Sequence, residues 1–279
     1  MAGAQKKTAL LCYDGDWIKP TGTTPKTHMI KPEIGRLPNG MDLSNSVENE
    51  FLCLQLMDGF GLCAANVEMT QFDDKKALIV ERFDRRWTSD GRLIRLPQED
   101  CCQALSVAST QKYQSEGGPG IAAVMDLQLG SDEPNKDRYD FFKVNVLFWL
   151  LGATDGHAKN FSLGLMPGGR FRMTPLYHVL TVQPIIDARQ IEPKNFRLAM
   201  NFGKSNHYIV PKIVGRHIVE TALQSGMSRN VANWHFEELR DTSGRIVDEV
   251  FTRLPANFPD ELLTAVDRAL TTRLRLLHV

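Results

Sequence analysis

The sharpest chemical signal in the sequence is the polar segment Asp155-Gly156-His157-Ala158-Lys159-Asn160, which lies between two apolar runs. Asp155 and Asn160 stand five residues apart. Phosphoryl-transfer enzymes of the protein-kinase type use this interval for a carboxylate that orients the acceptor hydroxyl and an amide that holds magnesium on the phosphates. Lys159 would neutralise charge on the transferred group. Alone the spacing is weak evidence, because Asp-Gly is an ordinary turn and Asn an ordinary cap.

Two more candidates lie upstream of this segment. Lys31 ends a β-like run and Glu50 follows on an expected helix, so the lysine would contact nucleotide phosphates while the carboxylate holds it in place. The run Val80–Phe83 enters a charged turn, where backbone groups would bind adenine. Each has an ordinary alternative, namely a solvated lysine and glutamate in the first case and a plain strand end in the second.

The elements that must position these residues begin with a sheet. Short β-like runs alternate with turn sequences over the first hundred residues, at 8–13, 27–31, 67–72 and 76–83. Between them, apolar residues recur at intervals of three or four from Val47 to Met57, which predicts a helix capped by Asp42 or Ser44. We therefore expect a small mixed sheet with one helix packed on it.

The pattern becomes helical after about residue 100. Residues 139–151 are apolar nearly all round and predict a buried helix, while 211–225, 230–239 and 259–276 are amphipathic. The sequence thus predicts an α+β fold with two lobes and a ligand cleft between them. We expect a β-rich nucleotide-binding lobe over residues 1–90 and a helical lobe over residues 91–279.

Composition bounds the class of protein. Lys plus Arg (33) equals Asp plus Glu (33), so no net field attracts nucleic acid or an anionic membrane. The five cysteines form no C-x-x-C pair and are expected to be reduced thiols. The longest apolar run, 144–153, is shorter than the roughly 20 residues that span a bilayer. Because the N-terminus also lacks a signal-peptide pattern, we expect a cytoplasmic protein without membrane contacts.

Several segments, taken in order, resemble successive motifs of the HipA family of serine/threonine-protein kinase toxins. The resemblance begins at residue 3 and runs to near the end of the chain. The segments are Gly3-Ala4-Gln5-Lys6-Lys7-Thr8-Ala9-Leu10, Thr27-His28-Met29-Ile30-Lys31, Glu81-Arg82-Phe83-Asp84-Arg85, Leu96-Pro97-Gln98-Glu99-Asp100 and Asp155-Gly156-His157-Ala158-Lys159-Asn160-Phe161.

This resemblance implies a protein-kinase-like two-lobed fold, ATP and Mg2+ as cofactors, and transfer of a phosphoryl group to protein serine or threonine. It also implies a HipB-like antitoxin as partner, DNA contacted only through that antitoxin, and an aminoacyl-tRNA synthetase as protein substrate in the bacterial cytosol. The site residues that it implies are the catalytic Asp155 and Lys159, the nucleotide contacts Gln5, Lys7, Lys31, Glu81, Arg82, Phe83 and His157, and the magnesium ligand Asn160.

The sequence departs from the family pattern in two places. The family has a further N-terminal subdomain and a serine-bearing segment before Gly-Ala-Gln, whereas Met1-Ala2 precede Gly3 here, so we expect a truncated, frayed phosphate loop. In Thr174-Pro175-Leu176-Tyr177-His178, the histidine replaces the family's metal-binding Asp. Imidazole is a poor magnesium ligand, so we expect weak or absent kinase activity unless Asp187 supplies the missing carboxylate.

Two other functions stay open at this stage. In the first, the chain is an inactive remnant that binds an antitoxin or a synthetase, and the two departures from the family pattern favour this alternative. Less favoured is metal-dependent hydrolysis by His157, His178 and Asp155, since the sequence has no H-E-x-x-H motif.

Overall fold

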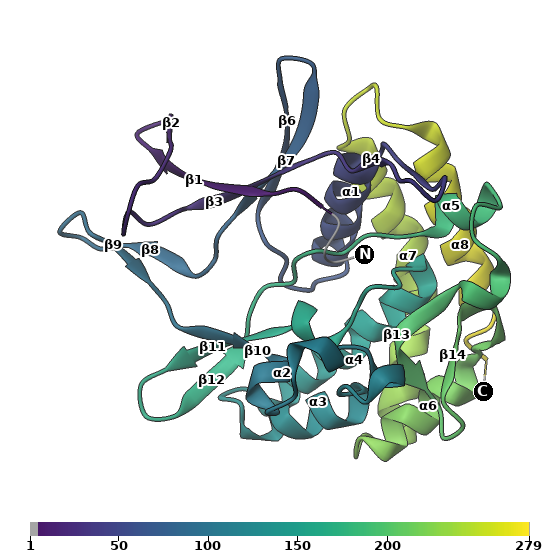
Figure 1. Cartoon of the computed structure of the whole chain (residues 1–279). Helices are drawn as coiled ribbons and strands as arrows, with labels where there is room; N and C mark the ends of the chain where they lie inside the picture. Colours follow the sequence, from purple (N-terminus) through teal and green to yellow (C-terminus); the bar gives the residue numbers. More distant parts are fainter. Residues whose placement is uncertain (1–4, 279) are drawn as a thin grey trace.

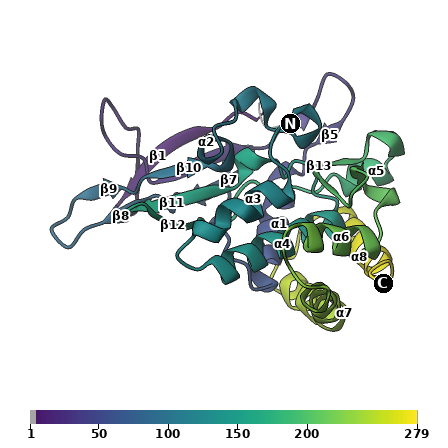
Figure 2. The same ribbon diagram turned by 90° about the horizontal axis from the view of Figure 1, so that it is seen from below.

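The computed structural model of the chain describes residues 5–278. Gly3 and Ala4 of the expected phosphate loop lie outside these described residues. Figures 1 and 2 show a strongly curved sheet on one side and a group of helices on the other, with α1 (Ser46–Gly59) between them. An α+β fold is therefore confirmed.

The main sheet has five strands in the order β2-β1-β3-β7-β6. Its bounds are β1 Thr8–Tyr13, β2 Asp16–Ile18, β3 His28–Pro32, β6 Val67–Phe72 and β7 Lys75–Glu81, close to the predicted runs. The expectation of a mixed sheet was wrong in one respect, because all four strand pairs are antiparallel. Tight turns with positive φ at Asp14, Gly15 and Asp73 join neighbouring strands, and such hairpins give antiparallel pairs.

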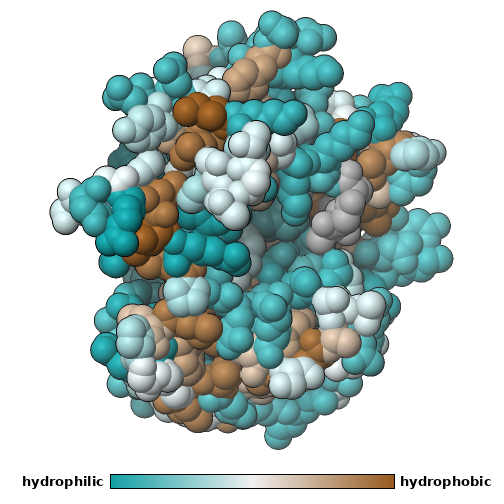
Figure 3. Space-filling view, turned by 60° about the vertical axis from the view of Figure 1, so that its left-hand side comes forward, coloured by the Kyte–Doolittle hydropathy of each residue, from teal (hydrophilic) through white to brown (hydrophobic). Residues whose placement is uncertain are grey.

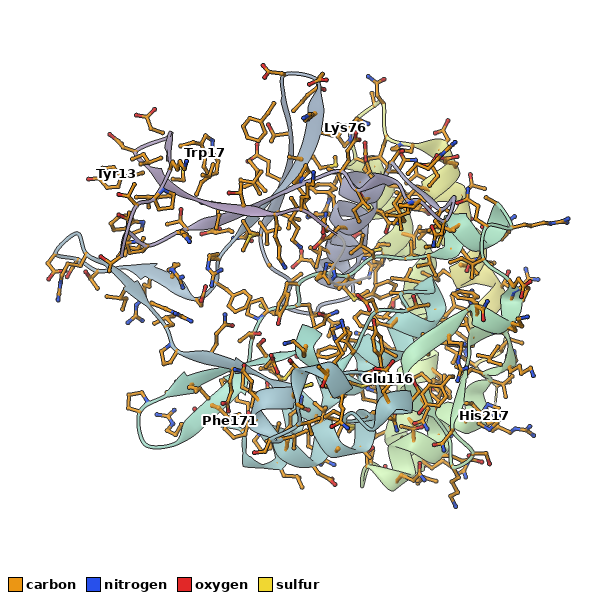
Figure 4. All side chains as sticks on the ribbon, in the orientation of Figure 1. Tyr13, Trp17, Lys76, Glu116, Phe171 and His217 are labelled. Atoms are coloured by element: carbon orange, nitrogen blue, oxygen red, sulfur yellow. The ribbon has the colours of Figure 1, made fainter. Side chains whose placement is uncertain are left out.

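β7 is the buried strand of this sheet, and its apolar residues 77–80 pack inside. At the opposite extreme, Tyr13 and Trp17 project from the outer end of the sheet, far from the helices (Figure 4), and are 56% and 39% exposed. The sheet is thus anchored where it meets α1 and is open to solvent at its far end.

Helix α1 joins the sheet to the helices, because it contacts β6 and β7 on one side and α7 (Arg229–Thr252) on the other. Its predicted caps are not used. The residue before the helix is Asn45, whose side chain makes no capping hydrogen bond. Asp42 Oδ1 instead accepts from Ser44, two residues before the helix. Such a local Asx turn competes with capping.

The remaining helices are α2 Cys101–Ala104, α3 Ile121–Leu127, α4 Pro134–Leu151, α5 Gln183–Asp187, α6 Gly215–Gln224 and α8 Asp260–Leu274. One small sheet has the order β10-β11-β12, with bounds Gln98–Asp100, Ser162–Met166 and Arg170–Met173. The other strand pairs are β4 Gly35–Arg36 with β5 Asp42–Leu43, β8 Arg85–Trp87 with β9 Leu93–Arg95, and β13 Arg197–Phe202 with β14 His207–Ile209.

Helix α4 is the centre of the core, as its apolar sequence predicts. Every residue from Phe141 to Leu151 is buried. Each fully buried Leu or Phe stabilises the fold by about 1.5–3 kcal/mol. Within residues 5–278, no helix combines the length and the apolar character needed to cross a membrane.

Candidate functional site

A cavity of about 490 Å³ opens between the main sheet and the segment that follows α4. The molecular surface is visibly hollowed between the upper and lower parts of the view in Figure 3. Ten of the predicted site residues line this cavity, namely Gln5, Lys7, Lys31, Glu81, Arg82, Phe83, His157, Lys159, Asn160 and His178. The chain therefore brings together residues that are far apart in sequence.

The remaining predicted residue, Asp155, lies directly beside the cavity. Its position follows from how α4 ends, because Gly152 adopts φ 72° and turns the chain out of the helix. Gly156 is required by packing, since a Cβ there would lie 2.3 Å from the ring of Phe148. These two glycines place the carboxylate at the end of the most buried helix, where it has little freedom to move.

Three side chains surround the Asp155 carboxylate, and one of them donates a hydrogen bond to it. Tyr113 donates a hydrogen bond to Oδ1 at 2.6 Å. Nε2 of His157 lies 3.8 Å from Oδ1, and Nε2 of His178 lies 3.6 Å from Oδ2. Burial opposes ionisation, but His178 and Tyr113 outweigh it and hold the Asp155 pKa below its usual value. The group is therefore an anion at neutral pH.

His157 is buried next to this anion and stays neutral. Burial lowers its pKa to about 4, although Asp155 favours the charged form. Its ring packs edge-on against Tyr113, with centroids 5.1 Å apart. Neither ring nitrogen has a hydrogen-bond partner among the described residues, so this imidazole has polar atoms left for a ligand in the cavity.

Asn160 is fixed by the same loop, because its Nδ2 donates to the carbonyl oxygen of Asp155 at 2.5 Å. This bond leaves Asn160 Oδ1 to face a ligand. Lys159 points into the cavity, with its Nζ 3.7 Å from Oδ2 of Asp100, too far for a hydrogen bond. The lysine is therefore held near the cavity without being neutralised by close contact.

Lys31 and Glu50 form the predicted ion pair. Lys31 Nζ lies 2.5 Å from Glu50 Oε1, and both residues are buried. Burial raises the Glu50 pKa, but the charges of Lys31 and His178 outweigh this and lower it to about 2. The solvated alternative for these two residues was therefore wrong.

His178 lies between Glu50 and Asp155. Its Nδ1 is 3.9 Å from Glu50 Oε2, while Nε2 faces Asp155, so one imidazole spans the buried carboxylate of Glu50 and the partly buried one of Asp155. Burial lowers its pKa, but the two carboxylates overcome this and raise the pKa above the usual value. His178 also has φ 58°, a left-handed conformation that Asp and Asn adopt more readily than most residues.

The residues present do not fit a magnesium site of the expected kind. Magnesium requires oxygen ligands, and Asn160 Oδ1 is the suitable donor among the predicted ligands. Asp187 does not replace the missing carboxylate, because it lies on α5 and is bound to Arg268 and Gln183. Among residues 5–278, no group of three or more His, Cys, Asp or Glu side chains is arranged to hold a metal ion.

The predicted hinge lies where β7 leaves the sheet. The N–H groups of Glu81 and Arg82 donate to Asn66 and Thr27, respectively. Phe83 N–H donates to no other described residue. The Phe83 ring lies 5.8 Å from that of Tyr177, and both rings line the cavity together with Met29 and Val80. One end of the cavity is therefore apolar, with a free backbone donor beside it.

Sequence reasoning missed residues 109–113 altogether. Ser109 and Lys112 line the cavity, and Tyr113 holds Asp155. The segment has no hydrophobic period, and it forms only the short 3-10 turn Ser109–Gln111. A tyrosine next to a lysine in an otherwise polar loop was the available hint, and it is not specific.

The chain matches the family model described as the HipA-like C-terminal domain over residues 1–257. It is 36% identical over 205 residues to the protein Y4mE of Sinorhizobium fredii, covering 73% of this chain and 46% of that protein. It is 30% identical over 203 residues to the serine/threonine-protein kinase toxin HipA of Shewanella oneidensis, covering 68% of this chain and 45% of the toxin.

The fold is similar to that of a chain in the solved complex of HipA, HipB and operator DNA from the Shewanella oneidensis MR-1 toxin–antitoxin system. The TM-score is 0.80 at 25% identity, and the match covers 99% of this chain and 63% of that chain. The expected HipA-type, kinase-like fold is thereby confirmed. The chain spans about half the length of the curated relatives it matches.

Proposed function

Because the chain belongs to the family of HipA-like C-terminal domains, we propose that it is the nucleotide-binding and catalytic part of a serine/threonine-protein kinase toxin. One observation supports this above all: an apolar wall, four lysines and Asp155 converge on one cavity. An apolar end and a cationic end match the two halves of ATP.

The nucleotide base would lie at the apolar end of the cavity. Met29, Val80, Phe83 and Tyr177 line this end, and the free Phe83 N–H can donate to a ring nitrogen of adenine. Burial of a flat aromatic base against these side chains is favourable, and the single backbone donor fixes its orientation.

The phosphates would lie at the other end, against Lys7, Lys31, Lys112 and Lys159. Asp155 would orient the hydroxyl of a serine or threonine and take its proton. The hydroxyl oxygen then bonds to the terminal phosphorus as the bond to the leaving ADP oxygen breaks. Lys159 would neutralise charge on the transferred group. Such catalysis consists almost entirely of positioning and charge neutralisation.

We expect this transfer to be slow. His178 contributes no oxygen ligand, and the Asp155 oxygens already face Tyr113 and His178. Because Oδ2 accepts no hydrogen bond from the described residues, an acceptor hydroxyl must bind beside His178 to reach it. By analogy with the relatives, a HipB-like antitoxin is the proposed partner, with DNA contacted only through it. An aminoacyl-tRNA synthetase is the proposed protein substrate, and the cytosol is the proposed location.

A second candidate function is binding without transfer, in which the domain docks an antitoxin or a synthetase. The contact between His178 and Asp155 favours it, because a carboxylate beside an imidazole whose pKa is raised is a weaker base when that imidazole is protonated.

Incubation of the protein with γ-labelled ATP and a mixture of acceptor proteins separates the two functions. We expect slow labelling of serine or threonine, reduced at least roughly 100-fold by Asp155→Ala. The exposed helical variant Asp241→Ala is the matched control and should label normally. Nucleotide binding without labelling would support the binding module, and absence of nucleotide binding would refute the assignment of the cavity.

A further inference from the structure

The lysines around the cavity lie on both of its walls, and most of them have no close ion-pair partner. Lys7 and Lys31 reach it from the main sheet, and Lys112 and Lys159 reach it from the opposite wall. Lys31 alone forms a close ion pair, with Glu50. The other three bring positive charge from both walls, so an anion with several charged groups would be contacted on two sides.

The carboxylates near the cavity are, in contrast, already engaged. Asp84 accepts from Arg82, Arg85 and Gln98. Glu81 accepts from Asn66. Glu50 and Asp155 are bound by Lys31 and Tyr113, and His178 lies between them. The other oxygens of the last two, Glu50 Oε2 and Asp155 Oδ2, accept no hydrogen bond from the described residues and face His178. A divalent cation would have to displace this imidazole before it gained a carboxylate ligand there.

From this distribution we infer that the cavity binds a nucleoside triphosphate without a divalent cation, with Lys7, Lys112 and Lys159 taking over neutralisation of the phosphates. The inference rests on the proposed nucleotide-binding function. Ammonium groups are suited to this role because each donates three hydrogen bonds to phosphate oxygens and carries a compact positive charge.

His178 completes the arrangement. It lies where a cation would be needed between the buried carboxylate of Glu50 and the partly buried carboxylate of Asp155, which would otherwise repel each other and the triphosphate. When protonated, the side chain supplies internally part of the neutralisation that a metal ion would give.

The test is the affinity of a fluorescent ATP analogue for the whole chain, measured in excess EDTA and in excess MgCl2. We expect the wild type to bind in EDTA, with an affinity within about threefold of that in MgCl2. Lys112→Ala should weaken binding in EDTA roughly 10-fold, because a charge-assisted contact is lost. Lys212→Ala, an exposed lysine that does not line the cavity, is the matched control.

His178→Asp provides a reciprocal measurement, since Asp tolerates the left-handed backbone at this position. It should lower affinity in EDTA roughly 10-fold and make binding depend on MgCl2. Wild-type binding only in MgCl2 would overturn the inference while leaving the proposed function intact. Unchanged affinity of Lys112→Ala in EDTA would likewise refute the lysine role. Binding in neither condition would remove the proposed function itself.

Discussion

Two buried cations, Lys31 at the cavity and Arg273 in the helical core, have partners of opposite kinds: a charged partner for Lys31 and uncharged partners for Arg273. Lys31 donates to the carboxylate of Glu50 and, among the described residues, to nothing else. Arg273 donates to the backbone oxygen of Leu150 and to the side-chain amide oxygen of Gln183, both uncharged. Burial lowers the Arg273 pKa to about 10, and only Asp187 opposes this.

The difference separates a structural charge from a functional one. The guanidinium of Arg273 connects α8 to the end of α4 and the start of α5, so its donors serve helix packing. Lys31 has donors left over and lines a cavity. A buried ammonium with unused donors beside open space is set up for an anion that is not part of the chain.

The largest expected effect comes from removing Lys31. Lys31→Met leaves Glu50 as an unpaired buried carboxylate, and we expect the free energy of unfolding to fall by about 3–5 kcal/mol. Nucleotide binding should be lost as well. Urea unfolding and nucleotide titration measure the two effects. Lys136→Met removes an exposed helix pair, Lys136 with Asp140, and should cost at most about 0.5 kcal/mol.

The double variant Lys31→Met/Glu50→Leu sharpens the comparison. With both charges removed, stability should return to within about 1 kcal/mol of the wild type, because apolar side chains replace a buried ion pair well. Nucleotide binding should not return. Recovery of binding in the double variant would show that Lys31 matters for folding alone.

The next effect concerns the helical core. Arg273→Met leaves the oxygens of Leu150 and Gln183 without donors, and we expect a loss of about 2–3 kcal/mol in the free energy of unfolding. Affinity for nucleotide should change by less than about threefold, because Arg273 does not line the cavity. A parallel loss of both properties would contradict the separation between the two cations.

The elements of the fold were predictable where one period dominates the sequence. The runs over β1, β6 and β7 and the apolar helix α4 match the structure to within a few residues. Helix α7 was predicted over 230–239 only, because residues 240–245 are polar and interrupt the apolar pattern. The helix in fact continues to Thr252, and buried apolar residues resume at Ile246. Strands β10 to β14 have only three to six residues each, and β10 pairs with β11 from far away in the sequence, so no local period revealed them.

The candidate site could be predicted as far as its motifs reach. Lys31, Glu50 and Asn160 lie where the ordered motifs placed them, and all the predicted residues converge at the cavity or beside it. The sequence could not show which side chains contact His178 and Asp187 in the folded chain. That His178 spans Glu50 and Asp155, and that Asp187 faces α8 instead, depends on backbone turns between residues 174 and 187.

Tyr113 is expected to give the smallest effect, and it tests whether the Asp155 contact belongs with the cavity or with the core. Tyr113→Phe removes one hydrogen bond to a carboxylate and no packing, so stability should fall by only about 1–1.5 kcal/mol. The same loss raises the pKa of Asp155, because Tyr113 helps to keep it low.

The acid limb of the pH–rate profile for labelling should therefore move to higher pH, with the KM for ATP unchanged. Tyr208→Phe, whose ring lies near Arg197 away from the cavity, should alter neither quantity. If Tyr113→Phe lowers stability but leaves the pH profile in place, the hydroxyl is a packing contact like those of Arg273 and does not position the base.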